Sequence, residues 1–261
     1  KQYRRVAGSG AFIDGFAGTG YGQHVRNGVT TRRDGSALIA SKSGAFASLN
    51  LIELNAGHYR TLNKSLETLT PKQREKITTL QADCNDAITE LLASDVLDPS
   101  RPCFALLDQD STQLAWTTIE TLSKWKTYEP PEDTRRPKSC KVELWILFNS
   151  YQAVTRLWPH DREKYPESFS PETLDRIMGG RDAWWDLWEA KQPFGRLVDR
   201  FAERLRELGY IYAIPQLIRD PATSRPQYHM IHATDHPSAI SFMRWAKRAV
   251  SGFENVALPG F

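Results

Sequence analysis

A glycine-rich turn follows an acidic residue near the start of the chain. The apolar run Ala11-Phe12-Ile13 ends at Asp14, and glycines follow at Gly15, Gly18, Gly20 and Gly22. A short apolar run predicts a buried strand, and the glycines let the backbone after it come close to a ligand. The turn does not complete the dinucleotide fingerprint, because Gln23 stands where a third glycine would follow Gly20. An acid at this strand end favours a ligand that carries a positive charge.

Three more acidic residues end apolar runs later in the chain. Glu53 ends the predicted strand 47–53, Asp83 ends 77–83, and Asp108 ends 102–108. Ligands of open parallel sheets bind at the carboxyl ends of the strands, so these acids are expected to converge with Asp14 on one crevice. An acid after the second strand accepts hydrogen bonds from ribose hydroxyls in nucleotide-binding folds, which makes Glu53 the candidate ribose ligand. The alternative for Glu53 is an exposed strand end without a ligand.

Some of these polar side chains also have a simpler structural interpretation. Asp83 or Asn85 can cap the predicted helix 86–93, and capping is compatible with ligand binding because ligands sit where helices begin. Asp108 can orient or deprotonate an acceptor group, and Asp110 adds a second carboxylate two residues later. Closely spaced acids also serve as ordinary helix caps, which is the interpretation we favour for Asp110 but not for Asp108.

The remaining elements predict an α/β fold with a Rossmann-like sheet and helices on both faces. Strands are predicted at 11–13, 47–53, 77–83, 102–108, 142–149, 210–218 and 227–234, and helices at 37–46, 59–69, from Pro71, and at 86–93, 114–122, 193–208 and 239–250. Fully apolar runs are typical of buried parallel strands, so the sheet is predicted to be mostly parallel. The last two strands are joined by a turn rich in Pro, Asp and Ser and therefore form a C-terminal antiparallel hairpin.

Two polar segments interrupt this pattern. Residues 23–36 carry Arg26, Arg32 and Arg33 and are predicted to form a solvated surface loop, with a phosphate-contacting loop as the alternative. Residues 128–139 contain prolines and a small basic cluster and are also predicted to be a loop.

A change in composition predicts a helical insertion after the fifth strand. Trp184 and Trp188 share a helix face within it and are expected to pack on the core, although exposed aromatics here would be able to stack on bases. The chain is accordingly divided into a Rossmann-like core at 1–156, an insertion or lid at 157–192, and a C-terminal part at 193–261 that completes the core.

The composition is that of an ordinary globular protein. The 261 residues are 40% hydrophobic and 25% charged, and no apolar run approaches the roughly 20 residues of a membrane helix. A soluble, cytoplasmic protein is therefore expected. The net charge of +3 leaves nucleic acid open as a partner. Because the chain starts at Lys1 and the first strand follows almost at once, we allow for a missing N-terminal segment.

The cysteines and histidines do not form a metal motif. The cysteines lack C-x-x-C spacing and are expected to be reduced and mostly buried: Cys84, Cys103 and Cys140. Three histidines near the end of the chain are interpreted as structural: His229, His232 and His236. No metal is assigned.

The order of the motifs resembles a known family. D-x-F-A-G-x-G-x-G from Asp14 resembles the first motif of class I S-adenosylmethionine-dependent methyltransferases. More narrowly, F-I-D-G-F-A-G-T-G followed by G-S-A-L-I-A is similar to the bacterial three-Cys-motif partner proteins (TcmP). The later segments that resemble this family are the helix with W-x-T-I spacing at 114–122, F-N-S at 148–150 and Y-H-M-I-H-A-T-D-H-P at 228–237.

This resemblance implies S-adenosylmethionine binding and methyl transfer. The implied cofactor ligands are Asp14, Phe16, Ala17, Gly18 and Gly20 for the methionine moiety, Glu53 for the ribose, and Asp83, or in second place Asn85, for the adenine. The sulfonium would then face an acceptor at Asp108 and Asp110. The implied partners are a three-Cys-motif companion protein and a nucleic acid.

The chain departs from the family at residues 108–111. D-Q-D-S stands where the partner proteins have a text close to D-P-F-G and amino-methylating nucleic-acid enzymes have D-P-P-Y or N-P-P-Y. The missing prolines and aromatic argue against methylation of a flipped base. Two functions follow: a methyltransferase acting on a nucleic acid or a partner-bound acceptor, or a catalytically inactive binding partner in a bacterial defence or modification system. Gln23 and the terminal hairpin disfavour an NAD-dependent enzyme.

Overall fold

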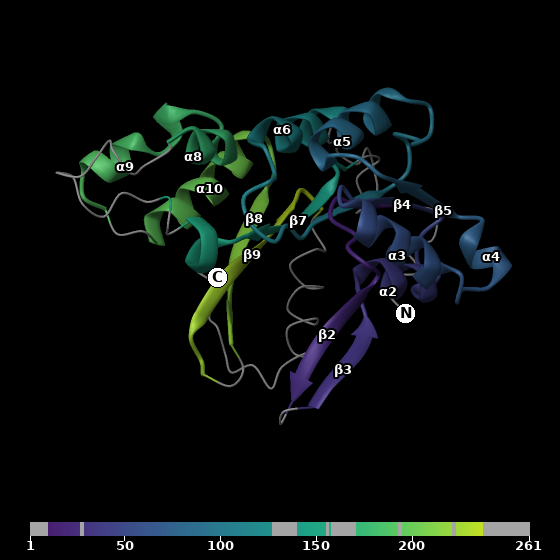
Figure 1. The fold of residues 1–261 in the computed structure, drawn as a ribbon. Coiled ribbons are helices and arrows are strands. Elements are labelled where there is room, and N and C mark those ends of the chain that lie inside the picture. Colours follow the sequence, from purple (N-terminus) through teal and green to yellow (C-terminus); the bar gives the residue numbers. More distant parts are fainter. Residues whose placement is uncertain are drawn as a thin grey trace.

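A seven-stranded sheet forms the centre of the computed structural model (Figure 1). Its strands are β1 (Ala11–Asp14), β4 (Ser48–Ile52), β5 (Ile77–Leu80), β6 (Cys103–Leu107), β7 (Glu143–Phe148), β8 (Tyr212–Arg219) and β9 (Pro226–Thr234). Their spatial order is β5-β4-β1-β6-β7-β9-β8. The first five are parallel, whereas β9 is antiparallel to both β7 and β8. The predicted mostly parallel sheet with a terminal antiparallel hairpin is confirmed.

The structure describes residues 10–26, 29–126, 140–154, 157, 171–192, 195–220 and 223–236. The predicted loop at 128–139 and the predicted helix at 239–250 lie outside these residues. Within them, no helix is both long and apolar enough to cross a membrane.

Helices cover both faces of the sheet. They are α2 (Ser36–Ser43), α3 (Ala56–Leu66), α4 (Pro71–Arg74), α5 (Cys84–Ala93), α6 (Trp116–Trp125), α8 (Pro171–Met178), α9 (Trp185–Glu189) and α10 (Gly195–Glu207). Successive strand residues point to opposite faces. Phe12 accordingly belongs to the core cluster under α2 and α3, whereas Ile13 belongs to the larger cluster under α5, α6 and α10.

The order of the strands creates a switch point at β1. The chain passes from β1 to β4 and β5 on one side, and then crosses to β6 and β7 on the other. In open α/β sheets, ligands bind outside the carboxyl ends of the strands at such a point. Asp14, Glu53, Asp83 and Asp108 lie at or just after the carboxyl ends of β1, β4, β5 and β6.

The predicted loop at 23–36 is wrong. Two strands, β2 (Tyr21–Arg26) and β3 (Val29–Asp34), pair there as an antiparallel hairpin separate from the main sheet (Figure 1). Both strands lack a run of apolar residues, so periodicity did not reveal them. Asn27-Gly28, which separates the paired Arg26 and Val29, is the strong local hairpin signal that the prediction missed.

The insertion packs into the core through its aromatic residues. Trp184 and Trp188 are buried in the same hydrophobic cluster as the sheet, together with Leu174 and Ile177 of α8. The prediction that the two tryptophans pack on the core is confirmed, and their burial excludes the alternative that they stack on bases. The three-part division of the chain stays a prediction.

The cysteines lie where the sequence predicts. All three are free, with Cys84 and Cys103 buried and Cys140 partly buried. Burial is the main cause that raises the pKa of each thiol to about 12. They are therefore protonated near neutral pH and unreactive as nucleophiles.

Candidate functional site

The glycine loop is held by backbone contacts to the strands on either side of β1. Gly15 N–H donates to Leu106 O of β6 at 2.9 Å, and Ala17 N–H donates to Ile52 O of β4 at 2.8 Å. Ser65 of α3 donates its hydroxyl to Thr19 O at 2.9 Å. The loop therefore has one defined conformation across the switch point.

Two glycines of this loop share a left-handed backbone conformation but have different surroundings. Gly18 and Gly20 have φ values of 59° and 79°, in the left-handed region that favours glycine. A Cβ on Gly20 would approach Leu62 and Ser65 at 3.3 Å, so Gly20 lets α3 pack against the loop. A Cβ on Gly18 would meet no atom within 4 Å, so Gly18 faces open space that a ligand can occupy.

Asp14 is buried beneath the loop. Its side chain has 0% exposure, and its oxygens accept hydrogen bonds from Ser36 Oγ at 2.6 Å and Phe16 N–H at 3.2 Å. Loss of solvent is the largest cause that raises the pKa of Asp14 to about 6, and the charges of Asp108 and Glu53 raise it further. A direct contact between Asp14 and a ligand, as predicted, would need an accessible carboxylate. In this conformation, Asp14 instead fixes the loop and the start of α2.

This burial predicts an unusual pH dependence of stability. The unfolded Asp14 ionises near 3.8, whereas the folded carboxyl holds its proton up to about pH 6. The folded state therefore binds more protons in this window, and the free energy of unfolding falls as the pH rises through it, by up to about 3 kcal/mol. We expect Asp14→Asn to abolish this loss and to be more stable than the wild type at pH 8 by about 1–2 kcal/mol, measured by urea unfolding at pH 5 and pH 8.

Ser36→Ala provides the matched control for this prediction. The Ser36 hydroxyl lowers the pKa of Asp14, so its removal should extend the loss of stability to higher pH. An Asp14→Asn variant with the same difference between pH 5 and pH 8 as the wild type would contradict the assignment.

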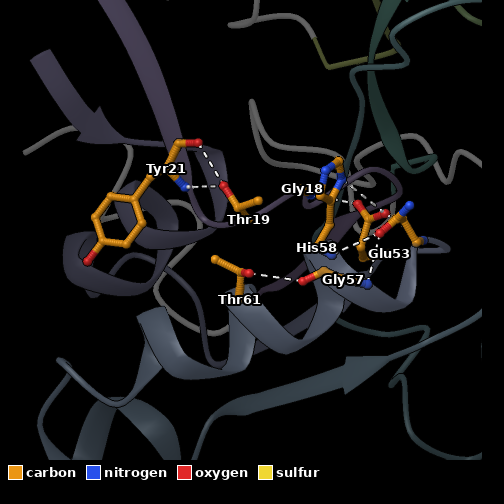
Figure 2. Close-up of polar contacts among 8 residues, drawn as sticks. Gly18, Thr19, Tyr21, Glu53, Gly57, His58 and Thr61 are labelled. Carbon is orange, nitrogen blue, oxygen red and sulfur yellow. Dashed lines mark hydrogen bonds and ion pairs between the residues drawn. The ribbon is translucent and has the colours of Figure 1, made fainter. Parts of the chain in front are cut away.

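Glu53 connects β4, the glycine loop and α3. Gly18 N–H donates to Glu53 Oε2 at 2.9 Å, and Asn55 N–H donates to Oε1 at 2.7 Å. The His58 ring approaches Oε1 at 3.8 Å, and Figure 2 shows the carboxylate beside Gly18 and this ring. Each carboxylate oxygen can accept more than one hydrogen bond, so Glu53 keeps capacity for hydroxyl donors.

Leu54 and His58 lie beside Glu53 and were missed by the sequence analysis. Leu54 is 61% exposed, which is unusual for a leucine directly after a buried strand, and His58 is exposed in the first turn of α3. The sequence shows a leucine directly after the acid at this strand end, and the structure adds that this leucine is exposed.

Asp83 and Asn85 have distinct structural roles. Asp83 is the N-cap of α5 and accepts the N–H of Asn85 at 2.8 Å, so the predicted capping is confirmed. The Asn85 amide donates to Asp83 and to Gln113 O, and it accepts from Ala115 N–H and Thr118 Oγ1. These four bonds use its whole capacity, so Asn85 positions the segment before α6 and has no bond left for a cofactor. Both bonds to Asp83 use its Oδ1, so its Oδ2 can still accept a hydrogen bond.

The segment after β6 exposes two carboxylates around a buried amide. Gln109 donates from Nε2 to Leu147 O at 3.2 Å and accepts from Leu114 N–H at 2.8 Å. This buried anchor, which the sequence analysis did not identify, leaves Asp108 and Asp110 exposed. Neighbouring protein atoms, and then the charge of Asp110, raise the pKa of Asp108.

Asn149 adds a hydrogen-bond acceptor at the adjacent strand end. Its Nδ2 donates to Asp110 O at 2.6 Å, whereas its Oδ1 is buried and accepts no hydrogen bond from the residues that the structure describes. A buried polar atom without a partner is rare and needs an explanation. Together with Asp108 and Asp110, it leaves this side of the site rich in acceptors.

The first residues of β9 border the same region. Partial burial, and then the charge of Asp108, raise the pKa of Tyr228. His229 shares a 2.8 Å hydrogen bond with Ser150 Oγ, and burial lowers its pKa to about 4, so its ring is neutral at pH 7. His232 bonds Glu143 at 2.7 Å on the neighbouring strand. The described residues contain no cluster of His, Cys, Asp or Glu suited to a metal ion.

The strand order, the switch point and the terminal antiparallel hairpin define a Rossmann-like α/β fold with the sheet of class I methyltransferases. No family model matches the chain, and no curated protein matches it. Solved structures that are similar over most of the chain include TYW2 from M. jannaschii in complex with AdoMet (11% identity, 89% of this chain and 73% of that one, TM-score 0.41). The methyltransferase domain of a bacterial CtHen1 is 14% identical over 85% and 89% of the two chains, with a TM-score of 0.38. Trm1 from Pyrococcus horikoshii with S-adenosyl-L-methionine is 11% identical over 86% and 50%, with a TM-score of 0.39.

Proposed function

We propose that this chain binds S-adenosylmethionine above the carboxyl ends of β1, β4 and β5 and transfers its methyl group to an acceptor beside Asp108. The observation that carries the proposal is electrostatic. Asp14 and Glu53 both bind the glycine loop, through Phe16 N–H and Gly18 N–H, and Asp108 follows β6, the strand beside β1. The charges of Glu53 and Asp108 accordingly add to the burial that raises the pKa of Asp14. Carboxylates that repel one another favour a cationic ligand, and S-adenosylmethionine carries an ammonium and a sulfonium.

The cofactor would lie along the glycine loop. The open space at Gly18 would receive the methionine moiety, and Glu53 would accept hydrogen bonds from the ribose hydroxyls. The exposed Leu54 offers an apolar surface for the purine ring, and the free oxygen of Asp83 can accept from its amino group.

The acceptor would be a group that carries its own N–H or O–H. Asp108 and Asp110 expose carboxylates that can accept hydrogen bonds, and the buried Asn149 Oδ1 beside them has no donor among the described residues, so this side of the site suits a donor. In the proposed step, the acceptor nitrogen or oxygen attacks the methyl carbon while the carbon–sulfur bond breaks. S-adenosylhomocysteine leaves, and Asp108 takes the acceptor's proton. The rate would come chiefly from positioning.

At a finer level, we propose that the chain is a three-Cys-motif partner protein that acts on a nucleic acid or a partner-bound acceptor. The motifs at 12–20, 35–40 and 228–237 support this. The alternative is a catalytically inactive binding partner of the same fold. Its support is D-Q-D-S, because Gln109 serves as a structural anchor where the family has proline.

Calorimetry tests cofactor binding. We expect S-adenosylmethionine and S-adenosylhomocysteine to bind with micromolar affinity, whereas NAD should give no heat at the same concentration. Absence of binding by both adenosyl ligands would remove the proposal. Transfer of a labelled methyl group to nucleic acid, or to a co-purified protein, then separates the enzyme from the inactive binding partner.

A further inference from the structure

Two β-hairpins extend beyond the edge of the sheet that carries the candidate site. The β2–β3 hairpin leaves the glycine loop after Gly20 and returns at Gly35, where Gly35 N–H donates to Gly20 O at 2.8 Å. The β8–β9 hairpin continues past β7, because His229 pairs with Phe148, the last residue of that strand. Figure 1 shows both hairpins at the same side of the molecule, one on either side of the strand ends.

These hairpins carry an excess of formal positive charge. Residues 21–34 and 212–234 contain five arginines and two aspartates, an excess of three, which equals the net charge of all 261 residues. Four of the arginines are described and exposed: Arg32, Arg33, Arg219 and Arg225. Asp34 is paired with Lys42 at 2.6 Å, so it does not neutralise these arginines.

The surroundings of the arginines suit a polyanion that also contains rings. The Arg32 guanidinium lies 3.4 Å from the centre of the Tyr21 ring, which holds it in place on the hairpin. Beside the β8–β9 hairpin, Tyr151 follows β7, is 40% exposed and stacks on His229 of β9. Exposed aromatic rings beside basic side chains are typical of surfaces that bind single-stranded nucleic acid.

We propose that the two hairpins hold the phosphate backbone of a single-stranded nucleic acid across the candidate site. This inference rests on the proposed function and identifies the surface that would deliver its substrate. The arginines would bind phosphates on both sides, while Asp108 and Asp110 between them face sugar or base groups that donate hydrogen bonds. A flat anionic membrane fits less well, because its phosphates would be pressed against these carboxylates.

Fluorescence anisotropy with labelled 20-nucleotide RNA and DNA tests this surface at several salt concentrations. The variants are Arg32→Ser/Arg33→Ser on one hairpin and Arg219→Ser/Arg225→Ser on the other. Each pair should weaken binding by about tenfold and make the slope of log K against log salt less steep by about 1.4. The matched control is Lys72→Ser/Arg74→Ser on α4, which precedes β5 and therefore lies at the opposite edge of the sheet. The control should bind like the wild type.

Each outcome decides the inference. Equal losses in the control and hairpin variants, or wild-type binding by both hairpin variants, would overturn it, as would binding to anionic vesicles but not to nucleic acid. Arg219 also donates to Ser224 O in the turn, so Arg225→Ser alone repeats the test without disturbing that bond. Calorimetry with S-adenosylmethionine on the same variants should be unchanged. Nucleic acid binding without cofactor binding would leave this surface standing and remove the proposed function.

Discussion

We expect Asp108→Asn to lower the rate of methyl transfer by on the order of 10²–10³-fold while the affinity for S-adenosylmethionine stays within about twofold. Asp108 is exposed at the end of β6, and its pKa is raised, so its carboxylate is a better base than an ordinary aspartate. Asparagine keeps the shape and one acceptor oxygen but cannot take a proton. Single-turnover transfer from labelled cofactor measures the chemical step directly.

Asp110 and Asp95 provide the controls for this prediction. The charge of Asp110 raises the pKa of Asp108, so Asp110→Asn should shift the acid limb of the pH–rate profile to lower pH. Asp95→Asn alters an exposed acid between α5 and β6, at the other edge of the sheet, and should have no effect. Wild-type transfer by Asp108→Asn would show that Asp108 is not the base. A wild-type protein that binds the cofactor but transfers nothing would favour the inactive binding partner.

The second large effect is expected at Glu53. Glu53→Ala should weaken S-adenosylmethionine binding by on the order of 10²–10⁴-fold, because two hydrogen bonds from ribose hydroxyls to a charged group contribute about 1.5–3 kcal/mol each. The substitution also frees the N–H groups of Gly18 and Asn55, so the glycine loop loses its contact with the end of β4. Calorimetry measures the loss.

Glu53→Gln should be no milder than Glu53→Ala. Both carboxylate oxygens accept backbone N–H groups, so an amide would turn its own NH₂ toward one of them. Glu90→Ala removes an exposed acid on the outer side of α5 and serves as the charge-matched control. Urea unfolding of each variant separates a loss of affinity from a loss of fold. Wild-type affinity in folded Glu53→Ala would place the ribose elsewhere.

The elements that the sequence predicted well are those whose signal is local. All seven strands of the main sheet were predicted to within a few residues, because most are short apolar or β-branched runs beside a turn. The buried face of α10, with Leu197, Val198 and Phe201, follows from its helical spacing in the same way. The capping role of Asp83 depends on a residue two positions away, so it could also be predicted from the sequence.

The features that the sequence did not reveal depend on distant segments. Asn85 was a candidate cofactor ligand, but its amide is used by residues about 30 positions later, before and within α6. Gln109 was given no role, because its partners Leu147 and Leu114 come together through the sheet and the turn before α6. The β2–β3 hairpin was missed because its two strands contain too few apolar residues to produce a periodic pattern.

By itself, the sequence determined where the strands of the main sheet lie along the chain, the glycine turn after β1 and the four acids at successive strand ends. Each of these depends on neighbours along the chain. The tertiary structure decided what each acid can do. It buries Asp14 beneath the loop, binds Glu53 to Gly18 and leaves Asp108 exposed at the end of β6. The physical reason is that desolvation and hydrogen-bond partners set the pKa and accessibility of a carboxyl, and both come from segments far apart in sequence.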